Sequence, residues 1–107
     1  MAFRKEKITE QLQHLAGLFL AEESNNTSLI TVTGAKLSDD LKHATILLSI
    51  YPVEKEVEAL RFTKRKELEF RKYADARLRT GRIPRIAFDI DRGEKNRQRI
   101  DELSRDS

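Results

Sequence analysis

The stretch from Arg61 to Asp91 constrains the fold of this chain most, because it joins a long amphipathic helix to a strand that starts after a proline. At about 100° per residue, one flank of a helix over Lys64–Arg79 is apolar. This flank consists of Phe70, Tyr73, Ala74 and Leu78. A helix with one apolar flank must pack on a core, so the rest of the chain has to supply a surface for it.

The side of this helix opposite the apolar flank is basic. Arg65, Lys72 and Arg79 recur at heptad spacing, and Lys64 and Arg71 widen the charged side. On one straight helix the heptad positions would span about 21 Å, because each residue rises by about 1.5 Å. The sequence therefore predicts a basic ridge that is exposed while the other flank is buried.

The charge of the chain is concentrated in this region. Residues 61–85 contain 10 Lys and Arg but only 3 Asp and Glu, whereas the net charge of the whole chain is +3. A basic block in an otherwise balanced domain is typical of proteins that bind polyanions, although a solvated helix face can look the same. The candidate RNA-binding residues are Lys64, Arg65, Arg71, Lys72, Arg79, Arg82 and Arg85.

Hydrophobic periodicity predicts an α+β domain that spans residues 1–107. The strongest strand signal is the alternation of Ala44, Ile46, Leu48 and Ile50. The expected elements are a helix over Arg4–Glu22, strands over Leu29–Thr33 and Ala44–Tyr51, helices over Glu54–Phe62 and Lys64–Arg79, a strand over Arg85–Asp91, and a short C-terminal helix or tail over residues 92–107. A three-stranded sheet of this kind needs helices over one face.

Several finer features follow from the same periodicity. In the first helix, Ile8, Leu12, Leu15 and Phe19 should face the core, with Leu18 beside them. Val57 and Leu60 should be the inward side chains of the Glu54–Phe62 helix. The connection over Gly34–His43 is too polar for a core, and Ser38 to Asp40 could cap a helical turn within it.

Little in the sequence suggests catalysis, a cofactor or a metal. The chain has no cysteine, and His14 and His43 are isolated. Asp89 and Asp91 would share one face of a strand, but no third metal ligand accompanies them. No apolar run approaches the length of a membrane span. We therefore expect a cytoplasmic, non-enzymatic monomer without a membrane segment.

Aromatic side chains that could stack on bases are scarce. Tyr51 is a candidate, whereas Phe70 and Tyr73 belong to the apolar flank. This favours recognition of structured RNA by shape and backbone over reading of single-stranded sequence.

Three segments carry a resemblance to a known family. They are ITVTGAKLSDDLKHA over residues 30–44, RIPRIAFDID over residues 82–91, and Gly93-Glu94 with RIDEL over residues 99–103. In this order and spacing the chain resembles bacterial ribosome-binding factor A, an assembly factor of the small ribosomal subunit. Two features depart from that family: Ser24 to Thr27 replaces its Asp-Pro-Arg, and a glycine expected at its helix kink is missing.

The resemblance implies a type II KH-like fold with the order α-β-β-α-α-β. It also implies binding to the rRNA of free small subunits or their precursors, a role in maturing the 5′ end of that rRNA, importance for growth in the cold, and no catalytic activity. In that family a helix-kink-helix with small residues replaces the usual KH loop, which here would place the kink at Ala74 and Ala76. Two alternatives remain open: a module that docks an acidic protein, and a KH-type binder of single-stranded RNA.

Overall fold

The computed structural model describes residues 2–23, 28–78 and 82–93, with side chains from Arg4 onward. Its elements are α1 (Ala2–Glu23), β1 (Leu29–Leu37), β2 (His43–Tyr51), the 3-10 turn η1 (Val53–Lys55), α2 (Glu56–Arg65), α3 (Glu67–Arg77) and β3 (Arg85–Ile90). This order confirms the α+β, type II KH-like architecture expected from the sequence.

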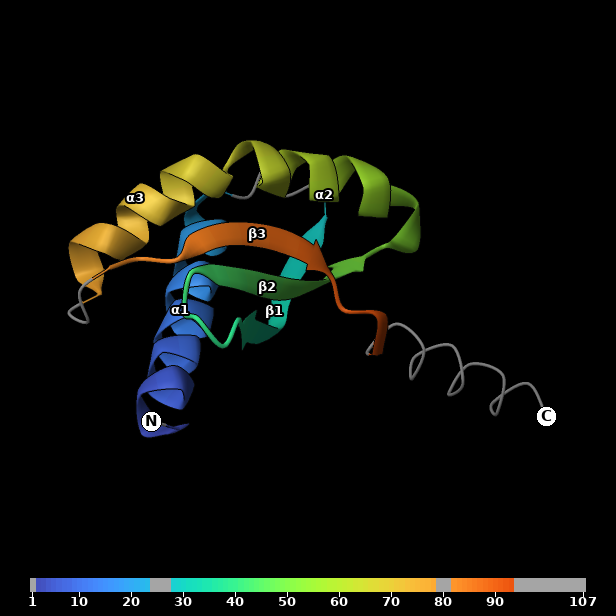
Figure 1. The fold of residues 1–107 in the computed structure, drawn as a ribbon. Helices are drawn as coiled ribbons and strands as arrows, with labels where there is room; N and C mark the ends of the chain where they lie inside the picture. The colour runs from blue at the N-terminus through green and yellow to red at the C-terminus, as the bar shows by residue number, and fades with distance from the viewer. Residues whose placement is uncertain (1, 24–27, 79–81, 94–107) are drawn as a thin grey trace.

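The three strands form one sheet in the order β1-β2-β3. Strand β1 is antiparallel to β2, and β2 is parallel to β3, with Ile46 opposite Phe88. A parallel pair needs a long crossover connection, which η1, α2 and α3 provide. Figure 1 shows α2 and α3 running along the side of the edge strand β3, while α1 lies near the other strands. The crossover helices are therefore held beside β3.

Alternate residues of β2 and β3 fill the core, as the periodicity predicted. The buried positions are Ala44, Ile46, Leu48 and Ile50 on β2 and Ile86, Phe88 and Ile90 on β3. Their neighbours, such as Leu47 and Ala87, are only half-buried on the other face of the sheet. The helices therefore cover one face, in agreement with the sequence.

Aromatic rings connect the helices to the sheet. The ring of Phe70 lies 5.4 Å from that of Phe19 and 5.5 Å from that of Phe88, measured between centroids. Tyr73 lies 5.3 Å from Phe19. Tilted ring pairs at these distances stabilise by about 0.5–1.5 kcal/mol beyond the area that they bury. This cluster joins α1, α3 and β3.

Helix α1 packs largely as predicted. Ile8, Leu12 and Phe19 are buried, and Leu15 is half-buried. Leu18, which was expected beside them, is instead 47% exposed. Ala16 and Leu20 are the further buried side chains of this helix.

Strand β1 is longer than the predicted Leu29–Thr33. It continues to Leu37, and its register shifts between Val32 and Gly34 where one residue is extra. A bulge of this kind lets a strand keep pairing despite an inserted residue, so the polar segment after Thr33 joins the sheet.

The β1–β2 connection is a short turn and not the helical turn that Ser38 to Asp40 could have capped. The amide of Leu41 donates to the carbonyl of Ser38 at 2.9 Å. The Asp40 carboxylate accepts from the Ser38 hydroxyl at 2.6 Å and from the Lys42 amide at 3.0 Å. These side chains provide hydrogen-bond partners for the backbone of the turn. The segment between β1 and β2 contains no helix that they could cap.

The crossover consists of two helices, as predicted. Their bounds are Glu56–Arg65 and Glu67–Arg77 instead of Glu54–Phe62 and Lys64–Arg79. The break is at Lys66, whose φ of −97° and ψ of 1° lie outside the helical region. The Lys66 ammonium contacts the carboxylates of Glu23 at 3.4 Å and Glu69 at 3.5 Å. The break thereby lies next to the end of α1.

The inward face of α2 also differs from the prediction. Ala59 and Thr63 are buried and Leu60 is half-buried, whereas Val57 is 63% exposed. Ala59 packs with Ile50 and Ile90 in a small second cluster. The small side chain of Ala59 lets the backbone of α2 approach the sheet closely, whereas Val57 lies on the exposed side of the helix.

The C-terminal end is only partly described. The third strand ends at Ile90, one residue before the predicted end. Arg92 and Gly93 have helical backbone, and the remainder of the expected C-terminal helix, residues 94–107, lies outside the described residues. Within the described ranges, every helix is too short or too polar to cross a membrane.

We expect Phe88→Ala to lower the free energy of unfolding by about 3–5 kcal/mol, because it leaves a cavity next to Phe70. The matched control is Leu47→Ala, which truncates a half-buried side chain on the other sheet face. Urea unfolding followed by circular dichroism measures both. Equal losses for the two variants would contradict the assignment of the core face.

Candidate nucleic-acid interface

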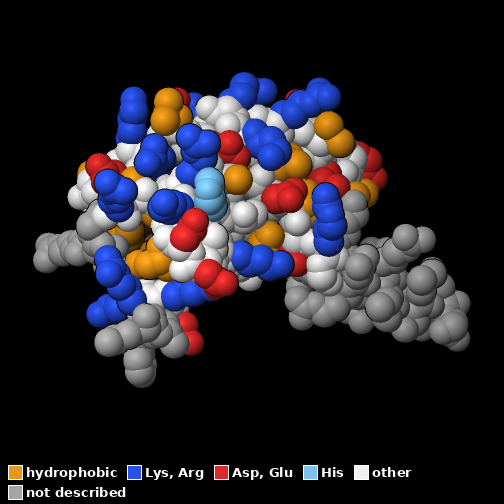
Figure 2. Space-filling model, viewed as in Figure 1, with side chains coloured by type: hydrophobic (Ala, Val, Ile, Leu, Met, Phe, Trp, Pro, Cys, Tyr) orange, Lys and Arg blue, Asp and Glu red, His pale blue; other side chains and the backbone are white. Residues whose placement is uncertain are grey.

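The predicted RNA-binding residues that the structure describes are all exposed. They are Lys64 and Arg65 at the end of α2, Arg71 and Lys72 on α3, and Arg82 and Arg85 before and at the start of β3. Arg79 lies outside the described residues. Figure 2 shows Lys and Arg side chains gathered over the α2–α3 side of the molecule.

These exposed cations are not used in ion pairs within the part of the chain that the structure describes. No ion pair observed there involves Arg71, Lys72 or Arg82. A cation without a carboxylate partner keeps its full charge available for a ligand. Arg71, Lys72 and Arg82 thus have the electrostatic character that binding of an anion needs.

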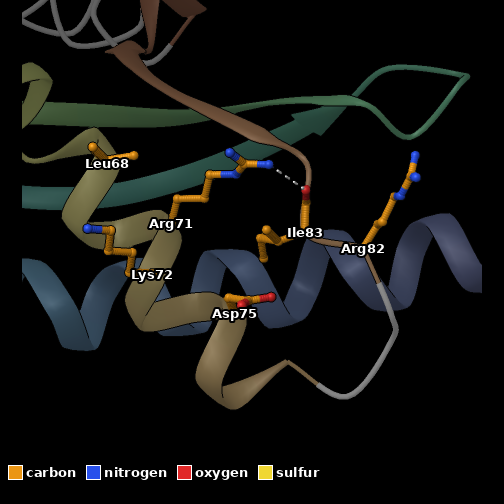
Figure 3. Close-up of a pocket in the computed structure, with 6 residues that line it drawn as sticks. All are labelled: Leu68, Arg71, Lys72, Asp75, Arg82 and Ile83. Atoms are coloured by element: carbon orange, nitrogen blue, oxygen red, sulfur yellow. Dashed lines mark hydrogen bonds between the residues drawn. The ribbon is translucent and has the colours of Figure 1, made fainter.

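Three of the predicted cations meet around one cavity of about 630 Å³. We call it the α3 cavity; it is lined by Leu68, Arg71, Lys72, Asp75, Arg82 and Ile83. Figure 3 shows that the first four residues come from α3 and the last two from the segment that leads into β3. The cavity is therefore formed by two segments that are separated in sequence.

One short hydrogen bond joins α3 to β3, and one long contact joins it to the segment before that strand. The carboxylate of Glu67 accepts from the Phe88 amide at 2.8 Å, which satisfies a backbone donor on the free edge of β3. The guanidinium of Arg71 donates to the carbonyl of Ile83 at 3.5 Å, as Figure 3 shows. The buried ring of Phe70 lies between Glu67 and Arg71 in the sequence. Together these three residues determine which face of α3 is exposed.

The predicted straight ridge of Arg65, Lys72 and Arg79 is wrong because the helix is interrupted at Lys66. Arg65 is the last residue of α2 and lines a separate cavity of about 60 Å³ with Lys55 and Phe62. Lys72 belongs to the α3 cavity instead. Heptad spacing aligns residues only along a continuous helix, so the break separates them.

The predicted kink at Ala74 and Ala76 also needs correction. Helix α3 continues through both residues and ends at Arg77, and the bend in the crossover is at Lys66. Ala74 is fully buried in the core cluster, whereas Ala76 is exposed. The small side chain of Ala74 is thus explained by close packing and not by a bend.

Four residues at this surface were not predicted from the sequence: Leu68, Asp75, Arg77 and Ile83. Leu68 and Asp75 line the α3 cavity, and Leu68 is 63% exposed. Arg77 stacks on Tyr73, with its guanidinium carbon 3.7 Å from the ring centroid. The spacing of Leu68, Arg71 and Asp75 at three and four residues could have indicated a shared face.

The other candidate residues lie elsewhere. Tyr51 is 73% exposed, but it is the last residue of β2. The candidate cations near β3 lie at the opposite end of this strand, where His43 pairs with Arg85. The carboxylate of Asp91 accepts from the Thr33 hydroxyl at 2.6 Å, and Asp89 accepts from the Ile90 amide. No group of three potential metal ligands occurs among the described residues. Both aspartates therefore have structural partners.

The β1–β2 turn has its own local charge pairing. A hydrogen bond and ion pair from Lys5, at 2.8 Å, hold the pKa of the Asp39 carboxyl below its usual value. The Ser38 hydroxyl and the Lys42 amide lower the pKa of Asp40 in the same way. Lys5 is thereby committed to the turn, in contrast to the unpaired cations around the α3 cavity.

Comparison with known proteins gives one consistent family. The sequence profile described as ribosome-binding factor A matches residues 4–104. Ribosome-binding factor A of Chlorobium limicola is 33% identical, over 99% of this chain and 92% of the relative.

Known structures are similar as well. The crystal structure of ribosome-binding factor A from Thermus thermophilus aligns with a TM-score of 0.71 at 24% identity, covering 80% of this chain and 93% of the other. A homology model of the Thermus thermophilus factor, fitted into a cryo-EM map of its 30S complex, aligns with a TM-score of 0.59 at 28% identity, covering 77% and 93%.

Substituting leucine for either of two alanines on α3 tests which of them is packed in the core and which is on the surface. We expect Ala74→Leu to lower the free energy of unfolding by about 1–3 kcal/mol, because the buried site has no room for the larger side chain. Ala76→Leu, on the exposed face, should change it by less than about 0.5 kcal/mol and leave RNA binding intact. Thermal unfolding and RNA titration measure these effects. A folded Ala76→Leu variant that fails to bind RNA would restore the kink hypothesis.

Proposed function

Because this chain belongs to the ribosome-binding factor A family, we propose that it binds the rRNA of the small ribosomal subunit through the α3 cavity surface. The observation that carries this proposal is the meeting of Arg71, Lys72 and Arg82 around one cavity without ion-pair partners in the described part of the chain. The Thermus thermophilus relative that was fitted into a 30S complex supports the choice of partner.

The chemistry of the surface favours a nucleic acid. Guanidinium and ammonium groups bind phosphate oxygens and release the counterions condensed on RNA, which gives affinity without regard to sequence. The surface lies along α3 and the approach to β3, two segments fixed by Glu67 and Phe70. Cations on a fixed helix and on the segment beside it can contact the backbone of a structured RNA at several points.

Two alternative functions have weaker support. An acidic protein could dock on the same cations, but this reading does not use the family membership. A KH-type binder of single-stranded RNA would use exposed aromatic platforms, and Tyr51 stands apart from the α3 cavity. The small-subunit proposal uses both the surface and the family.

We further propose that the bound protein assists maturation of the 5′ end of the small-subunit rRNA. The cytoplasm, where ribosomal subunits are assembled, would be its place of action, and it would act on free subunits or their precursors as a monomer. In this role the protein holds an RNA conformation and leaves the cleavage to nucleases. This extends the binding proposal by one step, from association to processing.

The binding proposal is tested by reversing the charges around the cavity. We expect Arg71→Glu/Lys72→Glu/Arg82→Glu to abolish co-sedimentation with purified small subunits. All three side chains are exposed, and the one described hydrogen bond lost is the long Arg71–Ile83 contact at 3.5 Å, so the circular dichroism spectrum should not change. Replacing the same residues singly by Ala should each lower the slope of log K against log salt by about one if each contacts a phosphate.

The matched control reverses three exposed lysines elsewhere, Lys7→Glu/Lys36→Glu/Lys42→Glu. It changes the net charge by the same amount as the cavity variant. It should still co-sediment with small subunits if binding depends on the cations around the α3 cavity and not on net charge. Loss of binding in this control alone would move the interface to α1 and the β1–β2 turn. Normal binding by the folded cavity variant would reject the proposed surface.

The processing proposal is tested in cells that lack their own ribosome-binding factor A. We expect expression of this chain to lower the fraction of small-subunit rRNA with an unprocessed 5′ end, measured by primer extension. The triple cavity variant should fail to do so at equal protein level. Normal subunit association without any change in precursor fraction would separate binding from processing and remove the second proposal.

A further inference from the structure

We propose that the α3 cavity holds an unpaired guanine of the bound RNA, in addition to the phosphate contacts around it. This inference rests on the proposed RNA binding and adds the kind of nucleotide that the cavity accepts. It is carried by the mixed lining of the cavity: apolar side chains and a carboxylate lie among the cations. Neither an apolar side chain nor a carboxylate contributes to the neutralisation of phosphates.

The apolar part of the lining suits the face of a base. Leu68 is 63% exposed on α3, and Ile83 lies on the facing segment, partly buried against the core. Figure 3 shows the Ile83 side chain directed back toward α3, between Arg71 and Asp75. A cavity of about 630 Å³ is within the usual range for small-ligand sites, so it can admit a base. Bases that a protein extrudes from a stack are held in pockets between aromatic or apolar side chains.

The carboxylate of Asp75 supplies the selectivity. It forms no ion pair within the described part of the chain, although three cations line the same cavity. A carboxylate next to a phosphate would weaken binding by repulsion, whereas it accepts hydrogen bonds from base N–H groups. Among the four RNA bases, guanine alone presents two parallel donors, N1–H and N2–H, to the two oxygens of one carboxylate.

Arg71 provides the complementary donor. It lies four residues before Asp75, so the two side chains are neighbours on one face of α3. Its guanidinium reaches across the cavity to the Ile83 carbonyl at 3.5 Å, and its other N–H groups have no partner among the described residues. A guanine whose N1 and N2 donate to Asp75 carries its O6 acceptor on the adjacent position, where a guanidinium can donate to it.

The remaining cations suit the backbone on either side of the base. In Figure 3 the side chains of Lys72 and Arg82 extend away from Ile83, toward opposite sides of the cavity. Phosphates that flank an extruded nucleotide diverge in a similar manner, so each could meet one cation. In this arrangement Asp75 and Arg71 bind the base, and Lys72 and Arg82 bind the phosphates.

The test uses four RNA hairpins that are identical except for one unpaired nucleotide, which is G, A, C or U. Binding is measured by fluorescence anisotropy at fixed salt. We expect the wild-type protein to bind the G hairpin about tenfold more tightly than the others, as expected for a bidentate base contact. Asp75→Asn should reduce this preference to less than about threefold, because an amide offers only one acceptor.

The same variant separates base recognition from simple electrostatics. If the surface binds only phosphates, removing the negative charge of Asp75 should strengthen binding to all four hairpins equally. The matched control is Glu54→Gln, an exposed acidic residue in η1 outside the cavity, which should not change the preference for G.

The failures of the two proposals are distinguishable. Equal wild-type affinity for the four hairpins, or uniformly tighter binding by Asp75→Asn, would overturn the guanine site and leave small-subunit binding standing. A protein that binds neither the hairpins nor purified small subunits would overturn both.

Discussion

Phe70 is the side chain on which the arrangement of this domain depends. Its fully buried ring contacts Phe19 of α1 and Phe88 of β3, so one residue of α3 joins the first helix to the last strand. Because a helix presents its sides in a fixed order, burying Phe70 and Ala74 on one side exposes Lys72 and Asp75 on the other. The position of the candidate RNA surface is a consequence of this core contact.

The interruption at Lys66 divides the basic crossover into two surfaces. Thr63 before it and Phe70 after it are both buried, so both helices pack on the core. The Lys66 ammonium meets the carboxylate of Glu23 near the end of α1, while the carboxylate of Glu67 accepts from the edge of β3. Adjacent residues of opposite charge thus tie the crossover to two different parts of the fold. Arg65 of α2 consequently lines one cavity, whereas Arg71 and Lys72 of α3 line another.

The α3 cavity combines interactions with different roles. Cations give affinity for any RNA backbone, and this term weakens as salt rises. An apolar wall and a carboxylate add little to that affinity, but they distinguish one base from another. A factor of this kind could therefore approach RNA through Lys72 and Arg82 and settle at one position through Asp75 and Arg71. The rigid placement of α3 would keep these groups in one geometry before the RNA arrives.

The sequence by itself determined the order of elements, the inward residues of β2 and β3, and the basic character of residues 61–85. These follow from local periodicity and composition, which a single segment carries. Only the tertiary structure decided that β1 continues past Gly34, because pairing with β2 outweighs the polarity of that segment. It also decided that the break between the two crossover helices lies at Lys66 and not at Thr63, which is buried within α2. Most importantly, it placed Arg82 and Ile83 opposite Arg71 and Asp75. No periodicity specifies which two segments face one another across a cavity, because that depends on how β3 pairs with β2.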